Sequence, residues 1–304
     1  MNEFICPPFL RPGDTVGITC PAGYVSQERI AYSAEVLARW GFQVKLGKTI
    51  GTGEFYFSGT DAERLADLQA MLDDERVKAI LMGRGGYGTS RIIDQIDFSK
   101  FLKSPKWICG FSDITVLHSH IQKNFGIATL HSPMCGAFTP EKENSIHIQS
   151  VRQALIGEPL SYSFSSSVFN RIGQAEGIVC GGNLALLSHL TGSVSQLDTG
   201  GKILFIEDIG EHLYQIDRML VNLKRSGQLR DLKALLVGSF SEVEDTERPF
   251  GKCLEEIILD AVSGYKYPVA FGFPCGHEAE NLALPLGRVA KLEVEEEGST
   301  LSLP

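Results

Sequence analysis

The sequence predicts an α/β protein of two domains. Short apolar runs rich in β-branched residues alternate with longer stretches whose apolar residues recur at helical spacing, which is typical of βαβ units and a parallel sheet. The alternation stops between Gly157 and Gly173, where five serines occur without a helical or long strand period. A length of 304 residues suits two domains of about 150 residues each.

We expect an N-terminal α/β domain over residues 1–157, a linker over residues 158–175 and a C-terminal α/β domain over residues 176–304. The N-terminal domain should hold a doubly wound, mostly parallel sheet of the flavodoxin-like kind. The C-terminal domain should hold a mixed sheet. Its tail alternates apolar and polar residues around Gly298, which is typical of a terminal β-hairpin.

The first half of the chain holds four predicted strands, at residues 15–19, 42–46, 77–82 and 107–110. The third, VKAILM, is almost wholly apolar, as expected for a strand buried on both faces of a parallel sheet. Helices are predicted at residues 26–40, 60–72 and 113–122. Ser26 should cap the first, and Thr60 or Asp61 the second. A further helical stretch should follow the glycine-rich turn GRGGYG of residues 83–88.

A second alternation begins at residue 176. Its predicted strands are at residues 176–183, 202–210, 234–240 and 269–274. Its predicted helices are at residues 184–191, 211–225 and 252–262. In open α/β sheets, reactive groups collect at the carboxyl ends of strands, where loops and helix N-termini meet, so these ends are the places to look for a site. A cleft between the two domains is the expected location.

Composition excludes several classes of protein. Twenty-eight basic and 37 acidic residues give a net charge of −9, which argues against broad binding to nucleic acid or anionic lipid. No stretch approaches 18 apolar residues and the first residues lack the features of a signal peptide, so we expect a cytoplasmic protein with no membrane contact. The seven cysteines form no C-x-x-C pair, which favours reduced thiols over a metal or redox site.

The first candidate residue is Ser112, just after the predicted strand WICG. A serine at a sharp strand-to-helix turn is held clear of the sheet, and the following helix N-terminus offers N–H groups to an oxyanion. Alternatively, Ser112 caps the helix and Asp113 complements its dipole. The motif departs from G-x-S-x-G because Ile114 replaces the second glycine, so the usual α/β-hydrolase elbow is excluded.

The second candidate is the turn GRGGYG, whose Gly83, Gly85 and Gly88 fall in the G-x-G-x-x-G register. The next strand ends without the acidic residue of a dinucleotide site, and the Lys-Ser/Thr of a P-loop is absent. Two other interpretations stay open. The turn brings backbone donors close to Ser112, or it is a tight connection without a ligand.

The third and fourth candidates are Glu207 and His277. Glu207 ends an apolar strand, where a carboxylate needs a partner, and either a helix cap or an ion pair with Arg218 would supply one. His277 follows a strand, a proline and a glycine, in a loop where a plain surface role is the alternative. Ser112, Glu207 and His277 follow the chain order nucleophile, acid, base, which hydrolytic triads use on α/β folds.

Six segments, spread in order over nearly the whole chain, resemble the LD-carboxypeptidase (murein tetrapeptide carboxypeptidase) family. The segments are RPGDTVGITCPAG, GRGGYG, GFSDIT, GGNL, IEDIGEHLYQIDRML and GFPCGH. The resemblance implies a serine peptidase with Ser112 as nucleophile, Glu207 as orienting acid and His277 as base. It also implies an oxyanion hole made by the backbone N–H groups of Gly86 and Asp113, a homodimer, and no metal or other cofactor.

The reaction implied by the resemblance is removal of the terminal D-alanine from L,D-linked muropeptide tetrapeptides during peptidoglycan recycling. Family members that hydrolyse the peptidyl-nucleotide microcin C suggest an alternative substrate class. A third possibility is a non-catalytic binding protein whose two domains close on a small molecule at the glycine turn. Arg84 is a candidate for binding the substrate carboxylate, with a structural ion pair as the alternative.

Overall fold

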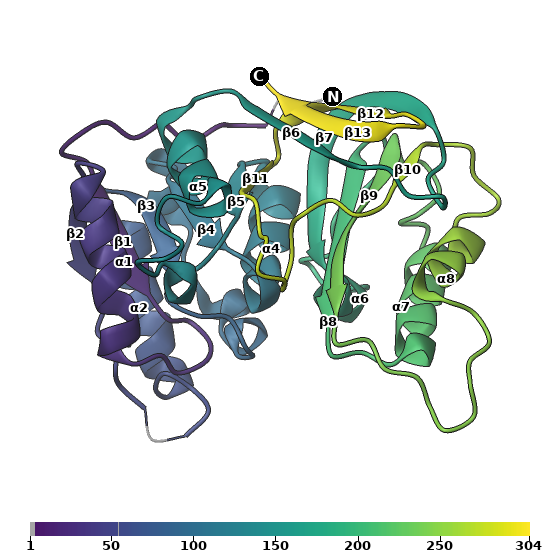
Figure 1. Ribbon diagram of the computed structural model, residues 1–304. Helices are drawn as coiled ribbons and strands as arrows, with labels where there is room; N and C mark the ends of the chain where they lie inside the picture. Colours follow the sequence, from purple (N-terminus) through teal and green to yellow (C-terminus); the bar gives the residue numbers. More distant parts are fainter. Residues whose placement is uncertain (1–3, 54) are drawn as a thin grey trace. The chain divides into compact units, whose positions relative to one another are not determined.

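The computed structural model describes residues 4–53 and 55–304. The chain divides into two units (Figure 1). Unit 1 comprises Met1–Glu158 and Leu282–Pro285, and unit 2 comprises Pro159–Asn281 and Leu286–Pro304. Each unit is an α/β domain with its own sheet, so the chain is a two-domain α/β protein as the sequence predicts.

Unit 1 is built on a six-stranded sheet in the order β11-β5-β4-β3-β1-β2. The strands are β1 (Thr15–Thr19), β2 (Gln43–Leu46), β3 (Val77–Met82), β4 (Trp107–Gly110), β5 (Thr129–His131) and β11 (Leu284–Leu286). The pairings from β2 through β5 are all parallel, which gives the 2-1-3-4-5 order of a flavodoxin-like, doubly wound sheet. This confirms the predicted N-terminal architecture.

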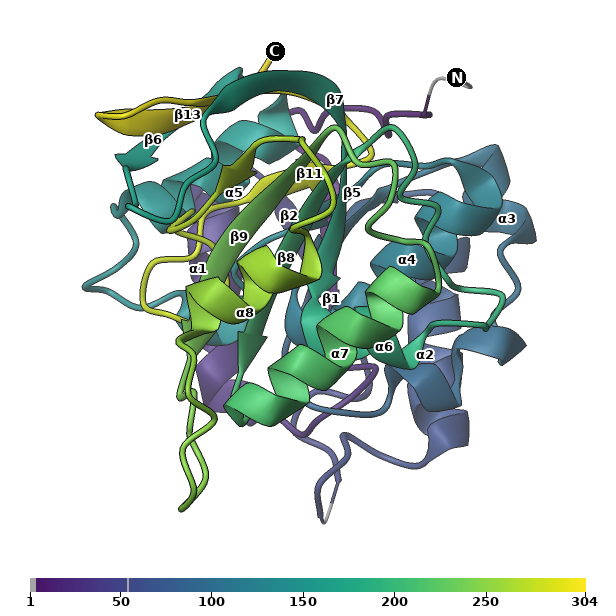
Figure 2. The ribbon, with the colours of Figure 1, turned by 90° about the vertical axis from the view of Figure 1, so that its right-hand side faces the viewer.

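Helices cover both faces of this sheet (Figure 2). The helices α1 and α5 lie on one face, and α2, α3 and α4 lie on the other. Their bounds are α1 (Gln27–Arg39), α2 (Asp61–Asp73), α3 (Ser99–Lys103), α4 (Thr115–Phe125) and α5 (Ile146–Ile156). The predicted caps of the first two are confirmed: the Ser26 side chain accepts from Arg29 N, and Thr60 forms a capping box with Glu63.

Unit 2 holds a mixed seven-stranded sheet in the order β10-β9-β8-β7-β12-β13-β6. The strands are β6 (Leu160–Ser165), β7 (Gly173–Asn183), β8 (Ile203–Ile209), β9 (Ala234–Ser241), β10 (Val269–Ala270), β12 (Val289–Val294) and β13 (Gly298–Leu303). The pairings from β7 to β10 are parallel, and those from β7 through β12 and β13 to β6 are antiparallel. The β12–β13 pair is the predicted terminal hairpin.

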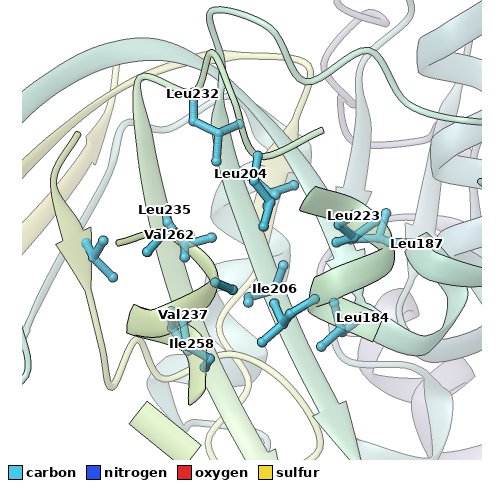
Figure 3. Packing of buried hydrophobic residues seen from close by; sticks show 14 of the residues in the cluster. Leu184, Leu187, Leu204, Ile206, Leu223, Leu232, Leu235, Val237, Ile258 and Val262 are labelled. Atoms are coloured by element: carbon cyan, nitrogen blue, oxygen red, sulfur yellow. The ribbon is translucent and has the colours of Figure 1, made fainter. Parts of the chain in front are cut away.

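One face of the parallel part of this sheet is covered by α6 (Leu184–His189), α7 (Leu213–Arg225) and α8 (Leu254–Ala261). Figure 3 shows the core that forms between them, where side chains of β8 and β9 pack against the helices. Leu204 and Ile206 of β8 meet Leu187 of α6 and Leu223 of α7 in this cluster. The buried apolar face fixes the end of β8, where Glu207 lies.

The structure corrects three expectations about local elements. The segment expected to be a linker forms the edge strand β6, which pairs with β13 through its backbone. Leu160 and Tyr162 are buried while Ser161, Ser163 and Ser165 are exposed, so the strand alternation is present, with serine at the solvent-facing positions. After the glycine-rich turn, two short 3₁₀ segments, Thr89–Arg91 and Ile93–Gln95, replace the expected helix. The last predicted strand, residues 269–274, is reduced to Val269–Ala270.

No helix within the described residues is long and apolar enough to cross a membrane.

Candidate active site

Ser112 lies in unit 1 at the carboxyl end of the buried strand β4. Its backbone has a φ of +62°, and only one other non-glycine residue in the described part of the chain, Glu242, has a positive φ. The left-handed conformation costs a non-glycine residue about 1–2 kcal/mol. No side-chain hydrogen bond caps either the 3₁₀ turn Ser112–Ile114 or α4 after it, so the helix-cap interpretation of Ser112 is wrong. The conformation instead turns the side chain out of the strand, where it is partly exposed.

Asp113 points into the protein. Its buried carboxylate accepts a hydrogen bond of 2.8 Å from the backbone N–H of Thr89, 24 residues earlier in the chain. Burial raises the pKa of this carboxyl above its ordinary value. The bond ties the turn after β4 to the loop after β3.

The glycine-rich loop of residues 83–88 lies against Ser112. A Cβ atom added to Gly85 would lie 3.1 Å from Ser112 Cβ and 3.3 Å from Ser112 Oγ. Gly86, the next residue, has a φ of +101°, which favours glycine. Because no α-helix starts after the loop, it lacks the helix N-terminus of a dinucleotide site. The geometry favours the interpretation in which this loop brings its backbone to the serine.

Arg84 is exposed, and its Nη1 donates a hydrogen bond of 2.8 Å to the carbonyl oxygen of Tyr24. The ion pairs of the described residues include none made by Arg84. Its guanidinium keeps further N–H donors beyond the one used on Tyr24.

Arg64 is a residue of this site that the sequence reasoning missed. Its guanidinium is fully buried and donates to the carbonyls of Pro21, Gly59 (3.3 Å) and Gly88 (3.1 Å), and also to Asp61. It therefore joins the loop after β1 to the end of the glycine-rich loop. Its signal in the sequence is spacing: Arg64 precedes Leu68 and Met71 by four and seven residues, on the face of α2 that is buried.

A second group of candidate residues lies in unit 2, on β8 and the loop after β10. Glu207 is fully buried, and its Oε2 lies 2.7 Å from Nδ1 of His277. A carboxylate can only accept, so the imidazole Nδ1–H donates and Nε2 is left as the nitrogen able to take up a proton. The His277 side chain is 13% exposed. This pair replaces the contact with Arg218 considered from the sequence; Arg218 instead lies over the ring of Tyr214.

Gly276 makes the carboxylate–imidazole contact possible. A Cβ atom added there would lie 3.0 Å from Glu207 Oε2 and 2.2 Å from Ser239 Oγ, so a side chain would push the loop away from β8 and β9. The loop is held by hydrogen bonds from Ser239 N to Cys275 O (2.9 Å) and from Gly276 N to Asn281 Oδ1 (3.2 Å). His277 is therefore positioned on a fixed loop, not on a strand or helix.

Asp208, the neighbour of Glu207, has a different role. Its carboxylate accepts from Asn183 Nδ2 (2.8 Å), Ile209 N (2.9 Å) and Ala185 N (2.9 Å). Burial raises its pKa to about 7. Asn183 in turn caps α6 by accepting from Leu186 N. The segment GGN and the aspartate thus fasten α6 to β8, and the glutamate alone faces the histidine.

Within residues 4–53 and 55–304, no group of three or more His, Cys, Asp or Glu side chains is placed to hold a metal ion.

Comparison with known proteins identifies the class and the family. The family model described as LD-carboxypeptidase N-terminal domain matches residues 16–132, and the one described as LD-carboxypeptidase C-terminal domain matches residues 176–292. The chain is 38% identical over 298 residues to the "Probable murein peptide carboxypeptidase" of Bacillus subtilis, covering 97% of this chain and 93% of the relative. It is 30% identical over 290 residues to the murein tetrapeptide carboxypeptidase of Pseudomonas aeruginosa, covering 91% and 92%.

Among solved structures, the muramoyltetrapeptide carboxypeptidase from Oxalobacter formigenes matches with a TM-score of 0.86 and 31% identity, over 95% of this chain and 98% of the other. These similarities define a hydrolase of the carboxypeptidase class. The chain belongs to the LD-carboxypeptidase family. The microcin C7 self-immunity protein MccF of Escherichia coli is also similar, at 27% identity over 330 residues, 97% of this chain and 94% of that protein.

Proposed function

We propose that the protein is a serine-type LD-carboxypeptidase that removes the terminal D-alanine from L,D-linked muropeptide tetrapeptides, in the cytoplasm, during peptidoglycan recycling. The observation that carries the proposal is the 2.7 Å hydrogen bond between His277 Nδ1 and the buried Glu207 carboxylate. Such a pair fixes the tautomer of the imidazole and stabilises its protonated form, which is what a general base for a serine requires. The names of the relatives supply the substrate class.

In this mechanism Nε2 of His277 takes the proton of the Ser112 hydroxyl as Oγ attacks the carbonyl carbon of the scissile bond. The tetrahedral intermediate collapses when the imidazolium gives the proton to the leaving nitrogen, which releases D-alanine and leaves an acyl ester on Ser112. Water, activated by the same histidine, then hydrolyses the ester and restores the serine. Glu207 orients the imidazole and stabilises the imidazolium.

The oxyanion of the intermediate is assigned to the backbone N–H groups of Asp113 and Gly86. Two features support this assignment. A Cβ atom added to Gly85 would lie only 3.1 Å from Ser112 Cβ, so the loop backbone lies close to the serine, and the Asp113 carboxylate anchors Thr89, just after the same loop. An oxyanion hole must be preorganised, because donors that reorient during the reaction lose much of their benefit. The buried contacts of Arg64 and Asp113 give the loop that rigidity.

The test is cleavage of an L,D-linked muropeptide tetrapeptide, followed by mass spectrometry. The wild-type protein should release D-alanine, and Ser112→Ala should lower kcat by about 10⁴- to 10⁶-fold, with comparable losses for His277→Ala. Ser99→Ala, an exposed serine of α3, is the matched control and should keep full activity. EDTA should leave the rate unchanged.

Near-wild-type turnover by Ser112→Ala would refute the serine mechanism. An intact tetrapeptide after incubation with the wild-type protein would favour the binding-protein alternative, since a binder leaves the D-alanine attached.

A further inference from the structure

Three loop segments of unit 1 are joined at the carboxyl edge of its sheet. They are residues 20–24, residues 55–58 and residues 83–88. Tyr24 N donates to Tyr56 O (2.9 Å), and Gly23 N donates to Gly85 O (2.9 Å). The middle segment is thereby aligned with the glycine-rich loop through a continuous set of backbone contacts, and the position of Tyr56 is fixed relative to that loop.

The phenol of Tyr56 lies over Gly86. A Cβ atom added to Gly86 would lie 3.0 Å from the Tyr56 hydroxyl oxygen and 3.6 Å from Gly23 Cα. The ring packs edge-on against Phe57 with 5.3 Å between centroids, yet the residue remains 54% exposed. The hydrogen bonds found among residues 4–53 and 55–304 include none made by this hydroxyl. A positioned O–H donor therefore faces solvent beside the loop assigned to the oxyanion hole.

The Arg84 side chain lies beside Gly23, close to Gly86 and the Tyr56 hydroxyl. A Cβ atom added to Gly23 would lie 3.6 Å from both Cδ and Nε of Arg84, and Gly23 is also the residue that faces Gly86. Arg84 donates one hydrogen bond to Tyr24 O and forms no ion pair with a carboxylate of the described residues. A phenol donor and a guanidinium thus flank one point of the loop, a combination suited to an anion.

The nucleophile and the Tyr56 hydroxyl lie beside consecutive residues of the loop. A Cβ atom on Gly85 would meet the Ser112 side chain, and one on Gly86, the next residue, would meet the Tyr56 hydroxyl. Consecutive Cα atoms are about 3.8 Å apart. In a carboxypeptidase substrate, the terminal carboxylate likewise lies one residue beyond the carbonyl that is attacked.

We propose that the Tyr56 hydroxyl and the Arg84 guanidinium bind the terminal carboxylate of the peptide substrate while its scissile carbonyl lies at Ser112. Desolvating that carboxylate without partners would be costly, and charge-assisted hydrogen bonds offset the cost. These two side chains would restrict the enzyme to substrates with a free C-terminus, because a substrate without a terminal carboxylate cannot make this contact. The inference rests on the proposed function and names the part of the site that selects a free chain end.

The experiment compares two substrates, the tetrapeptide with its free carboxylate and the same peptide ending in a carboxamide. Tyr56→Phe removes only the hydroxyl. It should raise KM for the acid by about 10- to 100-fold with kcat within about 2-fold, and change KM for the amide by less than about 2-fold. Arg84→Gln should likewise reduce the preference for the acid. Tyr32→Phe, on α1, is the matched control because the Tyr32 hydroxyl donates to Glu143 instead, and this variant should behave as wild type.

Equal effects of Tyr56→Phe on acid and amide, or no effect on either, would overturn the inference while the wild-type activity stands. A fall in kcat shared by both substrates would place the hydroxyl at the oxyanion and would also overturn it. Failure of the wild-type protein to cleave the tetrapeptide would instead refute the proposed function. Unchanged thermal melting of Tyr56→Phe excludes misfolding as the cause of any effect.

Discussion

At the scale of single residues, Ser112 shows how the site is kept under local strain. The residues before it continue the strand, and its own φ of +62° reverses the chain within one residue. The glycine-rich loop leaves room for the turn because Gly85 has no side chain to meet Ser112 Cβ. The strain is held by the buried Asp113 next to it, whose carboxylate is bonded to Thr89.

This strain predicts an order of stability among inactive variants. Ser112→Gly should unfold at a higher temperature than Ser112→Ala, because glycine adopts a positive φ without the steric cost that alanine shares with serine. The expected difference in the free energy of unfolding is about 1 kcal/mol, after the larger entropy loss of glycine is subtracted. Thermal or urea unfolding of the two variants measures it. Equal stability of the two, or a less stable glycine variant, would contradict the strain.

Candidate residues near strand ends can be picked out from the sequence, whereas the structure adds residues from other elements that the sequence does not single out. Ser112, Glu207 and His277 stand out in the sequence because each lies near the carboxyl end of a predicted strand, where reactive groups of α/β sheets collect. Arg64 is on a helix, 24 residues before the loop carbonyl of Gly88 to which it donates, and its spacing on the buried face of the helix does not reveal that partner. Tyr56 is on a loop whose pairing with residues 20–24 is a long-range backbone contact, which periodicity cannot reveal.

At the scale of elements, the end of α2 depends on a buried cation. Lys106 is almost fully buried, just before β4, and its ammonium donates to Met71 O (3.2 Å) and Asp74 O (2.7 Å) at the C-terminus of the helix. These carbonyls have no partner within the helix, so the lysine satisfies them. Burial lowers the pKa of Lys106 to about 8.

The lowered pKa has a defined consequence for stability. Between pH 8 and its ordinary value of 10.5, the unfolded chain holds a proton on Lys106 that the folded chain lacks. The contribution of this residue to the free energy of unfolding should therefore rise with pH across that range. The difference in free energy between wild type and Lys106→Met, measured by urea unfolding, should grow in favour of wild type as pH increases. Lys100→Met, at an exposed lysine, should give a difference that does not grow, and parallel curves for Lys106→Met would contradict the argument.

Elements with local signals were predicted well, and elements defined by pairing alone were not. The first two helices carry capping side chains and a periodic apolar face, so their N-termini were predicted within a residue. Strand β6 has serine at its solvent-facing positions and exists because β13 pairs with it. Strand β11 has three residues, too few to show a period, and its place beside β5 is decided by the fold.

At the scale of the whole molecule, the two units share one discontinuous chain. After the loop that carries His277, the chain supplies Leu282–Pro285 to unit 1 and then returns to finish the sheet of unit 2. In unit 1, β11 pairs with β5, and Ala283 N donates to Ser150 Oγ of α5 (2.9 Å). The predicted domain boundaries, 1–157 and 176–304, leave out the contribution of Leu282–Pro285 to unit 1. The sequence does not indicate it, because no change in composition marks these four residues.

Because Leu282–Pro285 belong to unit 1, we expect a substitution in this segment, close to the C-terminus, to destabilise unit 1. Leu284 is fully buried in β11, so Leu284→Ala should cost about 2–5 kcal/mol. Amide hydrogen exchange followed by mass spectrometry should show lost protection in β4 and β5, while β12 and β13 stay protected. Leu292→Ala, equally buried but on β12, is the matched control and should give the opposite pattern. If either substitution weakened protection equally in both sheets, the two units would unfold as one cooperative body. That result would contradict the expectation that each unit can be destabilised separately.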